Sequence, residues 1–566
     1  MRAFLALAAL AAALPFPSAH ATAAPPDRLL VVVTPGFSWQ APPPPELAAL
    51  VDASAVGALV PATGRRTYCA TDFWLTFSAG ARAALPGTSC GAVDWPEMLR
   101  ANASRHYGAR PGALAASLAA TRRCVMAYGP LARVAATLPD GTVPPGPCGV
   151  VVREVGSPAE AAAAVRFADD HPVLVVGWPP PGGHYGAVAL LGGHGLLRGG
   201  DTGTDGLLTI PDLHRYVVTG DLAIAPGSYR RLLDLDRAGH LHRRYAGVYL
   251  TGLIALPLLL YIVLGLRRSL GRPLRPVALL LAAYPAAGFL VSLVPWWRAG
   301  VPWLACGLGV AAAAALLAIV GRTEVGVAAA CGAVLLADLL TGARLERYGL
   351  ASYSALNGGR YSGLGNTGFA VLATCAVVVA GWLARRYGRL AWPALLLPVT
   401  AVDALPGKDF GGAAALLAAL AAGVATRARR AFVLAATAAG LAVSVAVAAA
   451  DYARPAADRT HLGRFVGEVL HGGAGNTLAR KAGAALHSVT GTWYPLLVVG
   501  SLWAAVAVLR RLRGDETVLP TARALAALWL VGSLLNDSGA MVAGVGMAVA
   551  VPLLVAYAVR REGVPW

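Results

Sequence analysis

The segment "AGVYLTGLIALPLLLYIVLGL", residues 246–266, is where the chain changes character. It contains no Asp, Glu, Lys or Arg, and it is long enough to cross the hydrocarbon core of a bilayer, which is about 30 Å thick. Apolar segments of this kind recur from here to the C-terminus, whereas the preceding residues have the composition of a soluble domain. We therefore expect a globular N-terminal part followed by a polytopic membrane part.

The composition agrees with this division. Of the 566 residues, 57% are hydrophobic and only 13% are charged, which is typical of an integral membrane protein. The formal net charge is +18, but the arginines lie between apolar segments and do not form one basic patch. We therefore expect membrane lipid as a partner, no nucleic acid partner, and no cofactor.

Eleven apolar segments are expected to span the membrane as an all-α bundle within residues 246–566. They are approximately 246–266, 276–295, 301–320, 324–341, 368–384, 390–403, 411–425, 431–450, 493–509, 521–535 and 540–559. If the soluble domain is exported, alternate loops place "LRRSLGRPLR", "GRTE", "RRYGR", "TRARR", "RRLRGDE" and the C-terminal tail inside. These loops are rich in arginine, as the positive-inside rule requires. The pattern predicts a multi-pass plasma membrane protein with an extracytoplasmic N-terminal domain and a cytoplasmic C-terminus.

The N-terminus has the features of a secretory signal peptide over residues 1–23. Arg2 is followed by the apolar run "AFLALAALAAALPF" and by "AHA" at 19–21, a small-x-small cleavage site. The alternative is an uncleaved membrane anchor. Export also explains four cysteines in the soluble part, Cys69, Cys90, Cys124 and Cys148, which we expect to form two disulfides. The sequence leaves their pairing open.

Residues 25–240 predict an α/β domain with a mostly parallel sheet. Short β-branched runs at 28–37, 148–155, 171–178 and 185–193 are typical of strands buried on both faces. Helical stretches are expected at 45–59, 111–129 and 157–170, and in the last of these Ser157 is the expected N-cap. Strands that alternate with helices favour this fold class.

Three motifs of this domain resemble the alkaline phosphatase-like superfamily. They are "LLVVVTPGF" (29–37), "TYCATDFWLTFSAG" (67–80) and "GLLTIPDLHRYVV" (206–218). The resemblance implies a metal-binding Asp at the end of the first strand and an Asp-His pair after a later strand. It also implies a catalytic nucleophile near the start of a helix, where Thr67 and Thr71 stand.

The sequence departs from that pattern at the metal site. Thr34-Pro35-Gly36 stands where the first Asp is expected, and Trp178-Pro179-Pro180 stands where Asp-His is expected. A divalent ion needs several carboxylate or imidazole ligands. His184, His194 and Asp201 are alternative ligands, although "GGHG" around His194 also suits a turn. We therefore predict a degenerate, metal-free and non-catalytic domain; an active metal-dependent phosphoryl or phospho-head-group transferase is the alternative.

Four polar stretches of the membrane part are expected on the side of the exported domain: "GGRYSGLGNTG" (358–368), "DALPGKDFGG" (403–412), "DRTHLGRFVGEVLHGG" (458–473) and "NDSG" (536–539). The expected outward polar cluster consists of Arg360, Tyr361, Asn366, Asp403, Lys408, Asp409, Arg464, Asn536, Asp537 and Ser538. These residues are either loop tips in water or the lining of a pocket at membrane depth, where ionisable groups are usually functional. Such a pocket suits an ion or the head group of a lipid-linked envelope precursor. Asp338, near the end of the fourth segment, is either a pathway residue or lies at the outer interface.

The whole chain also resembles a family of actinobacterial polytopic membrane proteins with an exported domain of this kind. The motifs that carry the resemblance are "GLGN" (363–366), "DFGG" (409–412) and "NDSG" (536–539). It implies a layout but no activity. The expected function is therefore binding or handling of a lipid-linked or anionic envelope component, and a transporter or flippase is a further alternative.

Overall fold

The computed structural model describes residues 25–561 except 66–68, 88–89, 92–93, 106, 169–170, 179–182, 267–270, 353, 358–360, 362, 405–408, 426–448, 450–451, 454–460, 471–473, 513–514, 516–517 and 537. The expected signal peptide and nearly all of the eighth apolar segment lie outside the described residues. The chain forms two compact units. We call them the N-terminal unit, which extends to Arg243 and includes Ser354–Tyr361, and the helical unit, which contains Arg244–Tyr353 and the residues from Ser362 onward.

The N-terminal unit is built on one nine-stranded mixed sheet. Its strands are β1 (Leu29–Thr34), β2 (Ser54–Val60), β3 (Val125–Tyr128), β4 (Val150–Glu154), β5 (Val173–Gly177), β6 (Gly186–Leu191), β7 (Gly195–Arg198), β8 (Leu207–Thr209) and β9 (Ala223–Ala225). The order is β3-β4-β1-β5-β6-β2-β7-β9, and β8 pairs with β2. β6 is antiparallel to both of its neighbours and β9 is antiparallel to β7, whereas the other pairings are parallel. The α/β class is confirmed.

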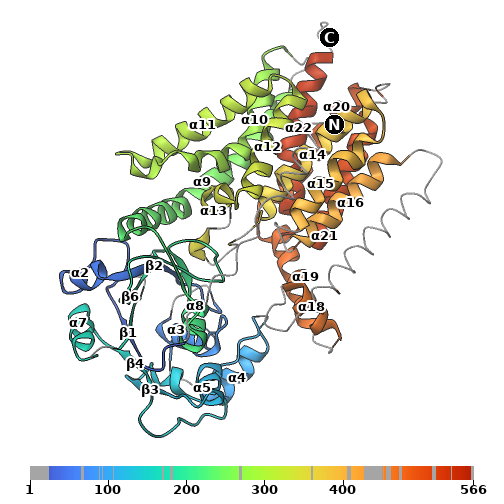
Figure 1. Ribbon diagram of the computed structural model, residues 1–566. Helices are drawn as coiled ribbons and strands as arrows, with labels where there is room; N and C mark the ends of the chain where they lie inside the picture. The colour runs from blue at the N-terminus through green and yellow to red at the C-terminus, as the bar shows by residue number, and fades with distance from the viewer. Residues whose placement is uncertain are drawn as a thin grey trace. The chain divides into compact units, whose positions relative to one another are not determined.

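Helices cover both faces of this sheet (Figure 1). α2 (Pro45–Asp52) and α7 (Pro158–Arg166) pack on one face, where Leu47, Val51 and Ala161 join the core. α3 (Ala70–Ala79), α5 (Ala113–Ala120) and α8 (Ile210–Thr219) pack on the other face, together with α4 (Trp95–Ala103) and α6 (Arg133–Ala136). Strands β2, β5 and β8 are buried along their whole length and β1 along most of it, as expected for strands that are covered on both faces.

Two of the three expected helices are shorter than the sequence suggested. The stretch 45–59 is helical only to Asp52, and its second half is strand β2. The stretch 111–129 is helical only over Ala113–Ala120, and its end is strand β3. The predicted start of the third helix is confirmed. α7 begins after Ser157, whose hydroxyl accepts a hydrogen bond from the backbone N–H of Glu160 at 3.2 Å. "SAVGALV" and "VMAY" are apolar at every position or nearly so, and periodicity alone cannot assign such runs.

Two disulfides join loops of the N-terminal unit. Cys69 pairs with Cys90, and Cys124 pairs with Cys148. The first bond ties the start of α3 to the loop that precedes α4. Cys306, Cys331 and Cys375 are buried free thiols in the helical unit.

The helical unit is a bundle of α-helices. They are α9 (Tyr229–Leu266, which begins in the N-terminal unit), α10 (Leu274–Leu290), α11 (Pro302–Gly321), α12 (Glu324–Leu340), α13 (Arg344–Tyr348), α14 (Asn366–Tyr387), α15 (Ala391–Ala404), α16 (Phe410–Val424), α18 (His461–Leu470), α19 (Ala474–Thr490), α20 (Tyr494–Arg511), α21 (Leu519–Leu535) and α22 (Ala540–Arg561). Among the described residues, six helices are long and apolar enough to cross a membrane. This result fits a membrane-embedded protein. The expected number of eleven membrane spans stays a prediction.

Helices α14 and α22 form the centre of the bundle. They are the most buried of the six long apolar helices, and α22 packs against α10, α14 and α20 (Figure 1). Ion pairs connect several helix ends around them. Glu324 accepts from Arg275 at 3.2 Å and from Arg560 at 3.0 Å, and Asp515 accepts from Arg561 at 3.1 Å. Arginine-bearing segments that the sequence assigned to one side of the membrane therefore meet at one end of the helical unit, which we call the arginine end.

Candidate functional site

The two positions at which the resemblance requires metal ligands lie side by side at the carboxyl edge of the sheet. Thr34 ends β1, and Trp178 follows β5 and donates its backbone N–H to the Thr34 carbonyl oxygen at 3.0 Å. The Trp178 ring packs against Phe73 and Trp74 of α3, with ring centroids 4.7 and 6.3 Å away. Aromatic rings thus occupy the region of these two positions, and these residues do not fit a divalent metal.

The alternative metal ligands are not brought together. His184 precedes β6 and lies 2.7 Å from a carboxylate oxygen of Asp236, and its ring stacks on that of His240. His194 is exposed in the turn after β6, so it lies at the opposite edge of the sheet from His184. Asp201 is bound to Arg215 at 2.6 Å. Among the described residues, no group of three or more His, Cys, Asp or Glu side chains could hold a metal ion.

Thr71, one of the two nucleophile candidates, is 2% exposed inside α3. The neighbouring Asp72 is fully buried, and its carboxylate accepts hydrogen bonds from Arg65 and from the backbone N–H of Leu85 at 2.8 Å. Burial raises the pKa of Asp72, although the Arg65 bond opposes the shift. The other candidate, Thr67, lies outside the described residues.

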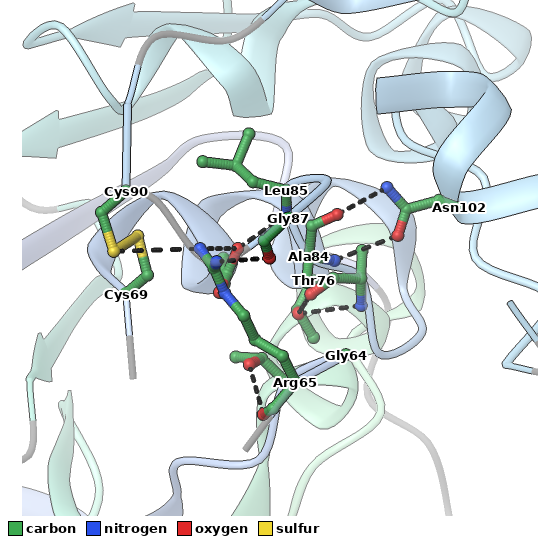
Figure 2. A network of polar contacts seen from close by, with 12 residues as sticks. Gly64, Arg65, Cys69, Thr76, Ala84, Leu85, Gly87, Cys90 and Asn102 are labelled. Atoms are coloured by element: carbon green, nitrogen blue, oxygen red, sulfur yellow. Dashed lines mark hydrogen bonds and ion pairs between the residues drawn. A yellow bond between two sulfur atoms is a disulfide. The ribbon is translucent and has the colours of Figure 1, made fainter. Parts of the chain in front are cut away.

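The polar groups around α3 hold a loop in place (Figure 2). Thr76 exchanges two hydrogen bonds with the backbone of Ala83, at 3.0 and 3.1 Å. Asn102 makes a matching pair with the backbone of Ala84, at 2.9 and 3.0 Å. Arg65 reaches past the Cys69–Cys90 disulfide to the Gly87 carbonyl oxygen at 3.2 Å. These contacts give the described residues of this region a structural role.

Tyr361 belongs to the N-terminal unit. The short segment Ser354–Tyr361 is part of this unit, and Ala355 and Leu356 are buried in its core. Tyr361 packs against the same core, and burial raises its pKa to about 12. Tyr361 and Asn366 thus belong to different compact units, and their grouping in one cluster stays a prediction.

Three segments that are distant in sequence converge in the helical unit. Asn366 begins α14, Asp403 lies at the end of α15, Asp409 is the N-cap of α16, and Asn536 and Ser538 connect α21 to α22. We call these five residues the polar cluster. Asp403 is 0% exposed, Asp409 6%, Asn366 7% and Asn536 8%. They are therefore not loop tips in water, which was one of the two sequence-based alternatives.

Hydrogen bonds within the polar cluster fix the helix ends. The Asp409 carboxylate accepts the backbone N–H of Gly412 at 3.1 Å, and the Asp409 backbone N–H donates to the Asp403 carbonyl oxygen at 3.1 Å. The Asn366 side-chain amide donates to the Ser538 hydroxyl. The side-chain nitrogen of Asn536 is buried and has no hydrogen-bond partner among the described residues. A buried amide donor of this kind usually has a hydrogen-bond partner.

Two glycines let the helices approach the polar cluster closely. A Cβ atom on Gly412 would lie 2.6 Å from both the Asp403 carboxylate and the Phe369 ring of α14. A Cβ atom on Gly411 would lie 2.9 Å from the side-chain oxygen of Asn536. The glycine pair of "DFGG" thus allows the first turn of α16 to contact both neighbouring segments.

The structure does not describe the side chains of four other residues of the expected outward cluster. Arg360, Lys408 and Asp537 lie outside the described residues, and Arg464 lies on α18 but its side chain is outside the description. Asp338 is 5% exposed and accepts the backbone N–H groups of Leu345 and Glu346 at 2.7 and 2.9 Å. It therefore caps α13, a role that neither sequence-based alternative included.

Glu346 was missed by the sequence analysis. It is 4% exposed, and a Cβ atom on Gly368 in the first turn of α14 would lie 2.5 Å from its carboxylate. A carboxylate beside the start of a helix is favoured by the helix dipole. The only signal in the sequence was an acidic residue close to an apolar segment, and that signal does not distinguish a buried carboxylate from a loop.

No family profile, no curated protein and no solved structure matches this chain. The resemblances to the alkaline phosphatase-like superfamily and to the actinobacterial membrane proteins stay predictions from the quoted motifs. The function must be argued from the sites themselves.

Proposed function

We propose that this protein is a cell-envelope membrane protein whose polar cluster binds the hydroxyl-bearing head group of a lipid-linked component. The observation that supports this proposal is the convergence of Asn366, Asp403, Asp409 and Asn536, each at least nine-tenths buried, from three separate segments. Ionisable groups inside a membrane domain are costly, so they are usually functional.

The lengths of α15 and α16 support a position below the membrane surface. α15 has 14 residues and α16 has 15, so each is only about 21–23 Å long at 1.5 Å per residue. A hydrocarbon core of about 30 Å is longer than either helix. Helices that end at this depth are tolerated where their ends are buried in protein or line a cavity, which suits a binding site at Asp403 and Asp409.

The chemistry of the polar cluster favours hydroxyl groups over phosphate. Carboxylates only accept hydrogen bonds, whereas Asn side chains both donate and accept. Asp403 and Asp409 would repel a phosphate but would accept hydrogen bonds from sugar hydroxyls. The buried amide nitrogen of Asn536 would donate to an oxygen of the same head group.

In this proposal the N-terminal unit lies outside the cell and binds envelope material without catalysis. The aromatic packing of Trp178 against Phe73 and Trp74 and the burial of Thr71 support a non-catalytic role. The disulfides Cys69–Cys90 and Cys124–Cys148 suit an oxidising compartment.

Transport of the same ligand is a second candidate. Interrupted helices form the substrate sites of many transporters, and the ends of the short helices α15 and α16 are joined by the hydrogen bond between Asp409 and Asp403. A transporter would move the head group across the bilayer, whereas a binding protein would only retain it. Flipping of a labelled glycolipid in proteoliposomes separates the two.

Photo-crosslinking of the purified full chain tests the binding site. The probe is a diacylglycerol lipid with a hexose head group that carries a diazirine. We expect saturable labelling of peptides from the first turns of α14, α16 or α22. Asp403→Asn and Asp409→Asn should each reduce this labelling at least fivefold, because each removes a charged acceptor.

The matched control is Asp515→Asn, which removes a carboxylate at the arginine end and should leave the labelling unchanged. A second probe has a phosphate head group in place of the hexose. The proposal is rejected if the phosphate probe labels the same peptides as strongly as the hexose probe, or if neither Asp403→Asn nor Asp409→Asn reduces hexose labelling.

A further inference from the structure

A large cavity lies in the helical unit, and no residue of the polar cluster is among those that line it. Its volume is about 950 Å³, near the upper end of the range for ligand pockets. Helices α12, α14, α20, α21 and α22 form its walls. Most of its lining is apolar, and it includes Trp382, Leu502, Leu525 and Leu554.

The cavity extends along most of α21. Its lining on this helix begins at Val518 and reaches Ser533, which is about 23 Å at 1.5 Å per residue. One leaflet contributes about 15 Å of hydrocarbon, half of the core thickness. The cavity is therefore long enough to hold an extended lipid chain.

An apolar cavity of this size is not expected to stay empty. The cavity is open on one side, because its lining residues Leu502, Val506 and Leu530 are 49%, 44% and 64% exposed. In a bilayer the abundant apolar molecules are lipids. An acyl chain would restore the contacts that an empty cavity lacks.

One end of the cavity is charged. Glu324, Arg385, Tyr557 and Arg560 line this end. Glu324 is 5% exposed, and its carboxylate forms ion pairs with the guanidinium groups of Arg560 at 3.0 Å and Arg275 at 3.2 Å.

Three arginine side chains lie close to the ring of Tyr557. The guanidinium groups of Arg385, Arg560 and Arg561 lie 5.9, 5.2 and 5.8 Å from the centre of this ring. The Tyr557 hydroxyl donates to Asp515 at 2.6 Å. All three of these arginine side chains are exposed.

Among the described residues that line this end of the cavity, positive charges exceed negative ones. Arg385 and Arg560 each carry one positive charge, and Glu324 carries one negative charge. An apolar cavity whose rim is positive complements a molecule with an anionic head and an apolar chain. The planar guanidinium group of arginine can donate two parallel hydrogen bonds to the oxygens of a phosphate.

We propose that this cavity binds an anionic glycerophospholipid of the bilayer. One acyl chain lies between α14, α20, α21 and α22, and the phosphate contacts Arg385 and Arg560. Basic pockets between membrane helices are a recognised kind of lipid site. The proposal is independent of the polar cluster, because no residue of that cluster lines this cavity.

Native mass spectrometry of the full chain, purified in mild detergent, tests the proposal. Phosphatidylglycerol and phosphatidylcholine are added at equal concentration. We expect the wild type to retain phosphatidylglycerol at least tenfold more than phosphatidylcholine. The variants Arg385→Gln and Arg385→Gln/Arg560→Gln should lose this preference, the double variant more completely.

A variant with a larger side chain in the cavity distinguishes the contribution of the lipid's acyl chain from that of its charged head group. Ala526 lines the cavity and is exposed, so Ala526→Trp should fold and should reduce retention of both lipids. The matched control is Arg389→Gln, since Arg389 is an exposed arginine that does not line the cavity. It should retain the wild-type preference.

Three results would overturn the proposal. The first is equal retention of the two lipids by the wild type, and the second is an unchanged preference in the double arginine variant. The third is displacement of phosphatidylglycerol by substoichiometric polyprenyl phosphate, which would assign the cavity to a different lipid. None of these results bears on hexose labelling at the polar cluster, so the two proposals fail separately.

Discussion

Individual side chains in the N-terminal unit connect its helices. His214 of α8 is an example. Its Nδ1 lies 2.7 Å from the Phe77 carbonyl oxygen of α3. Its ring also lies against Gly80, where a Cβ atom would be 2.9 Å from the imidazole. The histidine therefore fastens α8 to the end of α3.

Burial lowers the pKa of His214 below its ordinary value of 6.5. The unfolded chain thus binds this proton at higher pH than the folded chain does. The stability that His214 contributes is present above pH 6.5 and is lost as the pH falls through the lower folded-state pKa. We expect the thermal stability of the full chain to decrease between pH 7.5 and 5.5, and His214→Gln to weaken that dependence.

The exposed His194 provides the control for this titration. His194→Gln changes a histidine in a surface turn and should leave the pH dependence of the wild type intact. Differential scanning fluorimetry at several pH values measures all three proteins. An identical pH slope for His214→Gln and the wild type would contradict the assigned effect of burial.

At the scale of elements, the sequence predicted types of structure better than boundaries. The strands β1, β4, β5 and β6 and the helix α7 were predicted, because each is bounded by glycine, proline or a capping serine. Strand β2 was assigned to the preceding helix, because "SAVGALV" has no polar residue to reveal its period. Nothing local distinguishes such a run from a buried helix.

The polar cluster was partly predictable for a physical reason. If successive apolar segments cross the membrane in opposite directions, residues 366, 403–409 and 536–538 are all predicted on the same side of the membrane, however the helices pack. This alternation does not decide which segments are neighbours. That follows from the pairing of α16 with α21 and of α14 with α22, which includes small residues such as Gly532, where a Cβ atom would lie 3.6 Å from Ala415 of α16.

Substitution of Gly412 should disturb the contact between α16 and α14. In Gly412→Ala the new methyl group would lie 2.6 Å from the Asp403 carboxylate and from the Phe369 ring. Overpacking of this kind costs about 1–3 kcal/mol. We expect a lower melting temperature in detergent and weaker hexose labelling of the polar cluster.

Gly307→Ala is the matched control, because Gly307 lies inside α11 and a Cβ atom there would meet nothing within 4 Å. That change should be neutral or slightly stabilising, since alanine favours helix. A Gly412→Ala protein as stable as Gly307→Ala, with normal labelling, would show that the close approach of α16 is unimportant.

For the whole molecule, the helical unit carries two chemically different sites. The polar cluster offers carboxylates and amides, and the cavity at the arginine end offers a positive rim and an apolar interior. The first suits an uncharged, hydroxyl-rich head group and the second suits a phosphate with an acyl chain. The positive-inside rule assigns the arginine end to the cytoplasm, so the polar cluster is proposed to open on the other side.

Thiol labelling in intact cells tests the sidedness and the occupancy of the polar cluster together. Ser538→Cys and Arg389→Cys are introduced separately into the full chain, whose free cysteines in the helical unit are buried. A small membrane-impermeant thiol reagent is then added, with or without the hexose lipid. Ser538→Cys should react in intact cells and more slowly in the presence of the lipid, whereas Arg389→Cys should react only after permeabilisation. Reaction of Arg389→Cys, but not Ser538→Cys, in intact cells would contradict the proposed outward-facing site.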